Sequence, residues 1–424
     1  MKKLLFVILI AAAGFDATAQ SLMTLKECYE LALANNALSG EKEAYSNISR
    51  IRDENLFKGW MPVVDINANA MYNSSVVDFS AAQGMALPIR SMPRDQYKIT
   101  LDINQTLYDG GAIKNARALE QAELKLNEKQ TEIDEYKIKG EINTHYFNIM
   151  LLDRQKDILD NYLSLIEKKM ATTESAIANG VRLRNDLDVL KSEKITIEQQ
   201  ITENILRKKA LMKIMSDMTG VEINDLTRFV IPEPEYEQNE ELIRPELQMF
   251  DLKKEQLAVA MKMTESQRMP KAFGFATVGY GSPPGQNFFA DSFDTYYIFG
   301  AGIKWNIFDW HKTKNERQLI TIQREIVENR KTDMTNALKR ALDAKMSEIN
   351  SLKEMIKSDV ELLELRKRIS QTAESQYDNG TITAAEFLSE LNSEKNAVIN
   401  SDIRKLKLAL ASVEYMNISG KDIY

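Results

Sequence analysis

The sequence contains an internal duplication that constrains its fold more than any other feature. Residues 105–117 align with residues 305–317 at a shift of 200, with Asp, Lys, Asn and Arg recurring identically and Leu and Tyr recurring as Ile and Phe. Upstream, the Met-Pro pair at 61–62 recurs at 269–270. Self-similarity over such a distance indicates two copies of one structural unit.

Each copy begins with two segments in which apolar and polar side chains alternate, near residues 64–73 and 97–104 in the first copy and 272–280 and 297–306 in the second. A period of two predicts β-strands with one apolar and one polar face. The strands are about ten residues long and carry aromatic residues near their ends, as transmembrane β-strands do. A soluble sandwich with one solvated face fits the alternation equally well. Two features favour the membrane: four strands are few for a soluble core, and each pair continues into a very long helix.

The long helices are predicted from spacing and from missing helix breakers. Residues 109–179 contain no proline, and apolar residues recur there at coiled-coil-like intervals. Such a helix spans roughly 100 Å at about 1.5 Å per residue. The Asn-Gly pairs at 179–180 and 379–380 suit the left-handed turn that ends a helix. Helix is expected to resume over about 186–217 and 384–416, with one more helix over about 245–267.

The chain therefore divides into four predicted parts. Residues 1–19 have the basic start, short apolar run and small residues of a secretory signal peptide. The first repeat covers 20–219, an irregular connector with two prolines covers 220–241, and the second repeat covers 242–424. Cys28, on the expected first helix, is predicted to be a buried apolar residue.

Composition argues against several classes of function. One cysteine and two histidines make an intrachain disulfide impossible and a zinc site unlikely, and the net charge of −7 provides no general attraction to nucleic acid. The sequence has no phosphate-binding loop or nucleophile elbow. We therefore expect no cofactor, no metal, no nucleic-acid partner and no enzymatic activity.

The chain resembles the TolC family of outer-membrane efflux and secretion channels. The resemblance rests on the opening segment 22–36, on residues 105–111 and on the two Asn-Gly turns, and it covers nearly all of the chain after the signal peptide. It implies a mostly α-helical protein with a transmembrane β-barrel, in which a homotrimer forms one twelve-stranded barrel and a periplasmic α-helical tunnel.

The same resemblance implies the function and the partners. The chain is expected in the outer membrane, in contact with its lipid and extending into the periplasm. There it serves as a passive conduit of a tripartite efflux or type I secretion system, together with a periplasmic adaptor and an inner-membrane pump. The alternative is a secreted periplasmic coiled-coil adaptor or structural protein with a soluble β-domain.

The resemblance also implies two sets of site residues. In the family, polar and acidic residues narrow the tunnel at the periplasmic helix tips. The matching gate positions are Gly180, Asp186, Tyr377, Gly380 and Glu386. The glycines also suit simple helix termination, and the two acids also suit helix N-termini, where they interact favourably with the helix dipole. Ile382 and Ser389 depart from the family, because other members carry gate charges there.

The barrel lumen is expected to be lined by the polar strand faces. These residues are Asp65, Asn67, Asn69, Lys98, Asp102 and Lys304. The insert between the first two strands, about 74–94, is expected to be an extracellular loop.

Overall fold

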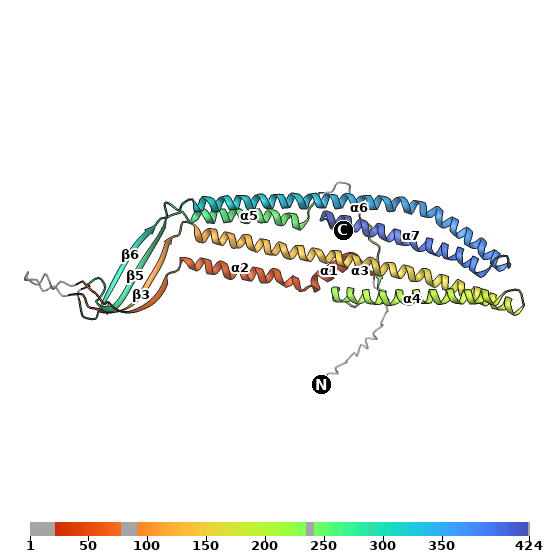
Figure 1. Ribbon diagram of the computed structural model, residues 1–424, viewed down its shortest axis with the longest axis horizontal. Coiled ribbons are helices and arrows are strands. Elements are labelled where there is room, and N and C mark those ends of the chain that lie inside the picture. Colours follow the sequence, from red (N-terminus) through yellow and green to blue (C-terminus); the bar gives the residue numbers. More distant parts are fainter. Residues whose placement is uncertain (1–21, 78–90, 235–240, 289, 423–424) are drawn as a thin grey trace, which may run out of the picture. The chain divides into compact units, whose positions relative to one another are not determined.

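The computed structural model describes residues 22–77, 91–234, 241–288 and 290–422 (Figure 1). The predicted signal peptide and most of the predicted extracellular loop lie outside these residues. The chain forms two compact units: the first comprises residues 1–39, 133–244 and 335–424, and the second comprises residues 40–132 and 245–334.

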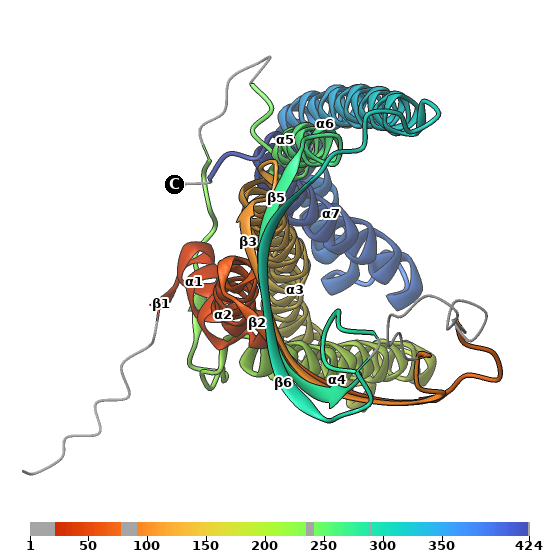
Figure 2. The ribbon, with the colours of Figure 1, turned by 90° about the vertical axis from the view of Figure 1, so that its left-hand side faces the viewer.

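The second unit contains a four-stranded antiparallel sheet in the order β2-β3-β5-β6, which Figure 2 shows as a curved ribbon. The strands are β2 (Val63–Tyr72), β3 (Asp95–Tyr108), β5 (Lys271–Ser282) and β6 (Asp294–Lys304). All four predicted strands are confirmed. Within the chain, β2 and β6 are the two edges of the sheet.

Helices lead into and out of each strand pair. Helix α2 (Glu41–Phe57) and the 3-10 turn η2 (Lys58–Trp60) precede β2, and α5 (Pro245–Ser266) precedes β5. The long helices α3 (Ala112–Ala178) and α6 (Lys312–Asp378) follow β3 and β6, and each has 67 residues. No helix in the described part of the chain is both long and apolar enough to cross a membrane.

The two strand-to-helix junctions share their hydrogen bonds. The Asp109 carboxylate accepts from the Ile113 backbone N–H at the start of α3, and the Asp309 carboxylate accepts from the Thr313 N–H at the start of α6. Side chains satisfy backbone donors at both helix starts, as helix termini require. The duplication seen in the sequence is therefore a structural repeat.

The first unit consists mainly of two helical hairpins. The second part of α3 packs with α4 (Arg184–Thr219), and the second part of α6 packs with α7 (Ala384–Ser419). Short α1 (Leu25–Asn35) joins this core, in which Cys28 is fully buried, as predicted.

A small parallel ladder of β1 (Leu22–Met23) and β4 (Arg228–Phe229) also belongs to the first unit. The Tyr146 ring is fully buried, and its hydroxyl is hydrogen-bonded to the backbone of Met23 in β1 and of Val230, directly after β4. The connector, expected to be irregular, thus contains one short regular element.

Candidate functional site

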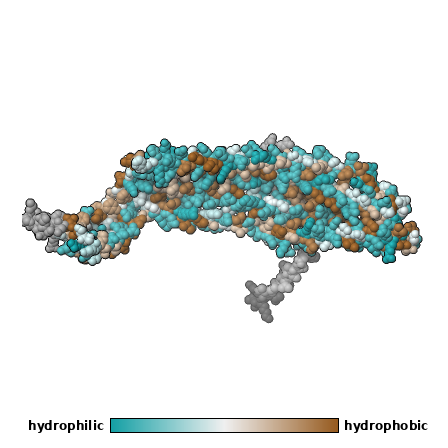
Figure 3. All heavy atoms as spheres, viewed as in Figure 1, coloured by the Kyte–Doolittle hydropathy of each residue, from teal (hydrophilic) through white to brown (hydrophobic). Residues whose placement is uncertain are grey.

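One face of the sheet is apolar and exposed across all four strands. The register aligns Ile66 with Leu101, Leu101 with Val278, and Val278 with Tyr297 in one row. On the edge strand β6, Tyr297, Phe299 and Ile303 are 76%, 79% and 77% exposed. On the face drawn in Figure 3, hydrophobic residues lie over the strands among polar ones. A contiguous apolar surface of this kind marks a membrane or protein contact.

The opposite face of the sheet is polar, and its centre is Asp102. The Asp102 carboxylate accepts hydrogen bonds from Asn67 (2.8 Å), Thr100 (2.7 Å) and Thr277 (2.5 Å), so it joins strands β2, β3 and β5. Asp65 lies directly opposite Asp102 in the register. The alternation thus separates an apolar face from a polar one, as a wall between lipid and water requires.

The remaining predicted lumen residues lie on this same polar face. Asn69 is opposite Lys98, whose ammonium group is 5.6 Å from the centre of the Tyr296 ring. Lys304 is at the end of β6, opposite Lys271. The structure therefore brings together all six side chains on one face.

Aromatic rings interrupt the polar face on β5. The Phe273 ring lies over Gly302 and the Phe275 ring lies over Gly300, both on the neighbouring strand β6. A Cβ atom at Gly302 would be 2.5 Å from the Phe273 ring, so no side chain fits there. The third predicted strand had the weakest alternation because of these two phenylalanines, whose partners are glycines 29 and 25 residues further along the chain.

The two helical hairpins of the first unit end in matching turns. Gly180 and Gly380 have φ angles of +74° and +78°, which favour glycine. In each turn the glycine N–H donates to the carbonyl three residues back, and the next N–H donates to the carbonyl five residues back. This is the Schellman arrangement that ends a helix. No atom lies within 4 Å of a Cβ built at either glycine, so the left-handed backbone alone selects the residue.

A cluster of contacts, here called the tip cluster, joins the two hairpins beside these turns. It consists of Thr173, Arg182, Asp186, Tyr377 and Phe387. The buried Tyr377 ring stacks on Phe387 with centroids 5.2 Å apart, and its hydroxyl is hydrogen-bonded to Thr173 at 2.7 Å. The Arg182 guanidinium lies 4.0 Å from the centre of the Tyr377 ring. Burial raises the pKa of the Tyr377 hydroxyl.

Asp186 is a buried member of the tip cluster. It is 8% exposed, accepts a hydrogen bond at 3.0 Å from the Ala384 N–H at the start of α7, and lies 3.6 Å from Arg182. Arg182 also donates to the Ile382 carbonyl at 3.1 Å. The carboxylate thus interacts with a helix N-terminus and a cation, and both interactions stabilise its negative charge.

Glu386 is placed differently from Asp186. It is exposed and forms a capping box with Thr383, accepting from the Thr383 N–H at 2.9 Å while the Glu386 N–H donates to the Thr383 hydroxyl. The hydrogen bonds from the Thr383 backbone and side chain lower the pKa of Glu386. The tip cluster therefore includes Asp186 and Tyr377 but not Glu386.

Arg182 is the tip residue that the sequence did not single out. The shift of 200 residues aligns it with Ile382, the position at which the family pattern had led us to look for a charge. The charge is present in the other repeat, and its guanidinium reaches the Ile382 carbonyl. An alignment of the two repeats at the shift of 200 residues reveals this charge in the sequence.

Lys169 makes a second connection between the hairpins, one helical turn from the tip cluster. Its ammonium group is 2.8 Å from carboxylates of Glu374 and Asp378, so it joins α3 to α6. Burial alone lowers the pKa of Lys169, but the hydrogen bonds that its ammonium group donates to these two acids outweigh burial and raise the pKa. Both connections hold the two hairpins of one chain together.

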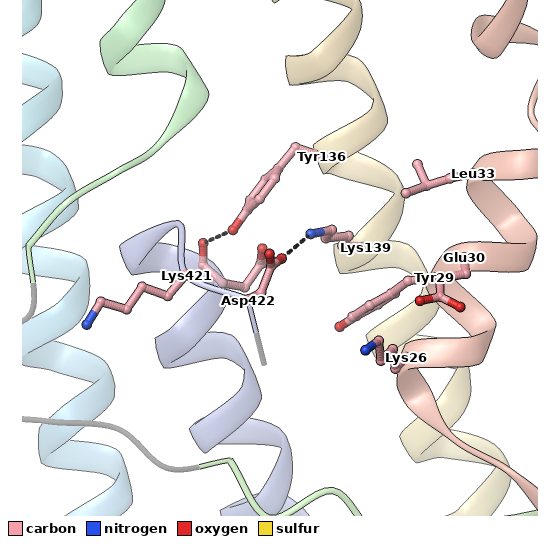
Figure 4. A pocket seen from close by; sticks show the side chains of 9 residues that line it. Lys26, Tyr29, Glu30, Leu33, Tyr136, Lys139, Lys421 and Asp422 are labelled. Carbon is pink, nitrogen blue, oxygen red and sulfur yellow. Dashed lines mark hydrogen bonds and ion pairs between the residues drawn. The ribbon is translucent and has the colours of Figure 1, made fainter. Parts of the chain in front are cut away.

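A pocket of about 220 Å³ lies elsewhere in the first unit, between α1, α3 and the end of α7 (Figure 4). Tyr29 and Tyr136 line it, and Lys139 is paired with Asp422 at 3.0 Å across it. The described residues contain no cluster of His, Cys, Asp and Glu that could hold a metal ion.

Comparison with known proteins finds a family match over part of the chain. Residues 57–204, which include β2, β3, the first part of α4 and all of α3, match the model of the outer membrane efflux protein family. No curated protein sequence matches the chain.

Solved structures share the fold over almost the whole chain. CusC, described in a study of folding and transmembrane channel formation, has 13% identity and a TM-score of 0.72, covering 94% of this chain and 92% of that one. The Campylobacter jejuni CmeC outer membrane channel has 14% identity and a TM-score of 0.67, covering 93% and 85%. The open state of the Neisseria gonorrhoeae MtrE outer membrane channel has 14% identity and a TM-score of 0.68, covering 94% and 89%.

The resemblance to the TolC family is therefore confirmed, and so is the mostly helical fold with a four-stranded sheet in each chain. The family that residues 57–204 match consists of outer membrane efflux proteins, in agreement with the expected location and function. The roles of the gate and lumen residues stay predictions.

Proposed function

We propose that three copies of this chain form a passive outer-membrane conduit of a tripartite efflux system, opened by a periplasmic adaptor and an inner-membrane pump. The observation that carries the proposal is the match of residues 57–204 to the outer membrane efflux protein family. The chain performs no chemistry, and the pump supplies the energy for transport.

The sheet itself supports the oligomer. Unpaired edges cannot lie in hydrocarbon, because each unsatisfied backbone group costs several kcal/mol there. Within the chain, β2 and β6 are edges, and four strands are too few to close a barrel. Three copies supply twelve strands and remove every edge, with the apolar face toward lipid and the Asp102 face toward water.

The tip cluster supports a gate at the end of the helical hairpins. Arg182, Asp186 and Tyr377 hold the two hairpins of one chain together through buried contacts. An adaptor that separates the hairpins has to break these contacts. In this scheme Gly180 and Gly380 shape the turns, and Glu386 contributes exposed negative charge beside them.

The proposal is tested by membrane extraction followed by conductance measurement. The protein is expected to pellet with outer membranes, to need detergent for release, and to produce discrete current steps in a planar lipid bilayer. Protein that is fully released in osmotic-shock fluid and carries no current would contradict the proposal. Deleting the gene and testing a panel of toxic compounds then identifies the cargo.

The alternative is a secreted coiled-coil adaptor with a soluble β-domain. It needs the apolar face of the sheet to be covered by the chain's own residues. Instead, Tyr297, Phe299 and Ile303 are more than three-quarters exposed. The structure therefore favours the channel.

A further inference from the structure

We infer that the edge strand β6 of one copy pairs with the edge strand β2 of a second copy in a defined register, with Ile303 opposite Ala68. This inference rests on the proposed oligomeric channel and adds to it the surface and the residue pairs that join the copies.

The two repeats superimpose in register, which makes the inference possible. Counterparts in the second repeat lie 200 residues later for β3 and 208 residues later for β2. Under these shifts the pair Val64 and Ile103 becomes Ala272 and Ile303, which are paired in the structure. One side-chain hydrogen bond is repeated too: Gln105 donates to the Trp60 carbonyl, and Trp305 donates to the Arg268 carbonyl.

The first part of α3 has a neighbouring helix on each side. Arg117 pairs with Asp53 of α2 at 2.7 Å, and Lys125 pairs with Glu255 of α5 at 3.1 Å. Because of these neighbours, the apolar residues Ala122 and Leu126 on α3 are only 5% and 7% exposed.

The first part of α6, its counterpart, has α5 beside it through the pair of Lys254 and Glu328 at 2.8 Å. The counterparts of the covered α3 residues are not covered. Ile322 and Ile326 are 44% and 46% exposed, and Leu319 on the same helix is 59% exposed. The same apolar face that α3 buries is therefore open on α6.

Helix α2 carries the complementary open surface. Its residues Ile48 and Ile51 are 43% and 50% exposed. Helix α2 of the first repeat is the counterpart of α5 of the second repeat. Helix α5 lies beside α3, which belongs to the first repeat. The occupant that fits the open face of α6 is therefore α2 of a second copy, placed as α5 is placed on α3. This contact is heterologous, and such contacts generate rings when the rotation closes.

The β3–β5 pairing fixes the register across the two copies, because within the described four-stranded sheet it is the pairing that joins one repeat to the other. Ile99 pairs with Tyr280, Leu101 with Val278 and Ile103 with Ala276. Each β3 residue is replaced by its counterpart 200 positions later in β6, and each β5 residue by its counterpart 208 positions earlier in β2. This gives the expected contacts between copies. These are Phe299 with Tyr72, Ala301 with Ala70, and Ile303 with Ala68.

The side chains agree with this register. Phe299, Ala301 and Ile303 of β6 then each lie opposite an apolar residue of β2, whereas a slip of one residue would bring the apolar face of β6 opposite the polar face of β2. Phe299 and Tyr72 form an aromatic cross-strand pair, and the large Ile303 faces the small Ala68. On the polar face, Lys304 lies opposite Asn67 and diagonal to Asp65.

Disulfide cross-linking distinguishes the registers. Directly opposite Cβ atoms are about 4.5–5.5 Å apart and diagonal ones about 7–8 Å, while a disulfide needs about 3.5–4.5 Å. The test variant is Ile303→Cys with Ala68→Cys. The slipped controls are Ile303→Cys with Ala70→Cys and Ile303→Cys with Ile66→Cys. A second predicted pair is Ala301→Cys with Ala70→Cys. It places the Ala70→Cys substitution, which is also used in a slipped control, opposite its predicted partner.

Each double variant is oxidised in isolated outer membranes and run on a non-reducing denaturing gel, beside its single-cysteine variants. The two predicted pairs are expected to form covalent multimers about tenfold faster than the slipped pairs. Faster cross-linking of a slipped pair overturns the register but leaves the ring intact. If no pair cross-links, while native mass spectrometry of the parent protein gives the mass of three copies, the β6–β2 pairing is overturned. A one-copy mass overturns the proposed oligomeric channel itself.

Discussion

The guanidinium of Arg182 is the part of the proposed gate that a single substitution tests best. In Arg182→Ala, the Tyr377 ring loses a cation 4.0 Å from its centre, and the Ile382 carbonyl loses a donor at 3.1 Å. A hydrogen bond to a charged group contributes about 1.5–3 kcal/mol, and a desolvated cation–π contact contributes about 2 kcal/mol. Since neighbouring contacts are not additive, we take about 3 kcal/mol for the pair.

If these contacts exist only in the closed tip, their loss raises the open-to-closed ratio about 100-fold, because about 1.4 kcal/mol corresponds to a factor of ten. Open probability is measured for single channels in planar bilayers at fixed voltage and salt. Arg184→Ala is the matched control, because Arg184 is an exposed arginine two residues further on. Arg182→Lys should give an intermediate value, since an ammonium lacks the planar fork. An Arg182→Ala channel that opens as rarely as the parent would refute the role of the tip cluster in gating.

Three further predictions concern groups outside the membrane. The hydrogen bonds from Thr383 hold the pKa of Glu386 below 4.5, so the capping box stabilises the start of α7 above that pH and its contribution is lost as the pH falls through the lowered pKa. Hydrogen exchange should show this loss in the parent and no such pH step in Glu386→Gln; equal pH dependence would argue against it. Burial and then the nearby Glu27 charge raise the pKa of Cys28 to about 12, so maleimide should label it only after denaturation, and rapid labelling of folded protein would contradict this. Tyr146→Phe removes a buried hydroxyl that bonds the backbone, so the free energy of unfolding should fall by about 1–3 kcal/mol in denaturant titrations, and unchanged stability would count against the assigned hydrogen bonds.

Most of the fold could be predicted because its signals are local. Alternation over about ten residues predicted the four strands, and the absence of proline between 109 and 179 predicted a helix that the structure places at Ala112–Ala178. Two Asn-Gly pairs predicted turns whose glycines have positive φ. Helix ends differed by only a few residues, as at α4, which begins at Arg184 instead of Asp186.

The features that were not predicted depend on contacts between distant residues or on unfavourable backbone angles. The β1–β4 ladder pairs residues more than two hundred positions apart, over two residues each, too short for any periodicity. Trp310 and His311 occupy positive φ at the positions where the first repeat has Gly110 and Gly111. Positive φ angles are uncommon for residues with bulky side chains, so the sequence did not predict them here.

For the same reason, the polar face of the sheet could be predicted from the sequence but the contacts within the tip cluster could not. Which strand residues share the polar face follows from the period of two, and all six predicted lumen residues lie there. The tip cluster depends instead on where two hairpins 200 residues apart meet. The alignment of the repeats places Arg182 at the position of Ile382, but the contact of its guanidinium with the Tyr377 ring depends on the fold.

The central claim is that several copies of an amphipathic sheet enclose water within a membrane. Electron cryo-microscopy of the full chain, extracted from outer membranes into lipid nanodiscs, tests it most directly. The account predicts three copies around an aqueous bore, with twelve strands and the Asp102 face inward. A single subunit with its sheet packed against its own helices, and no bore, would contradict it.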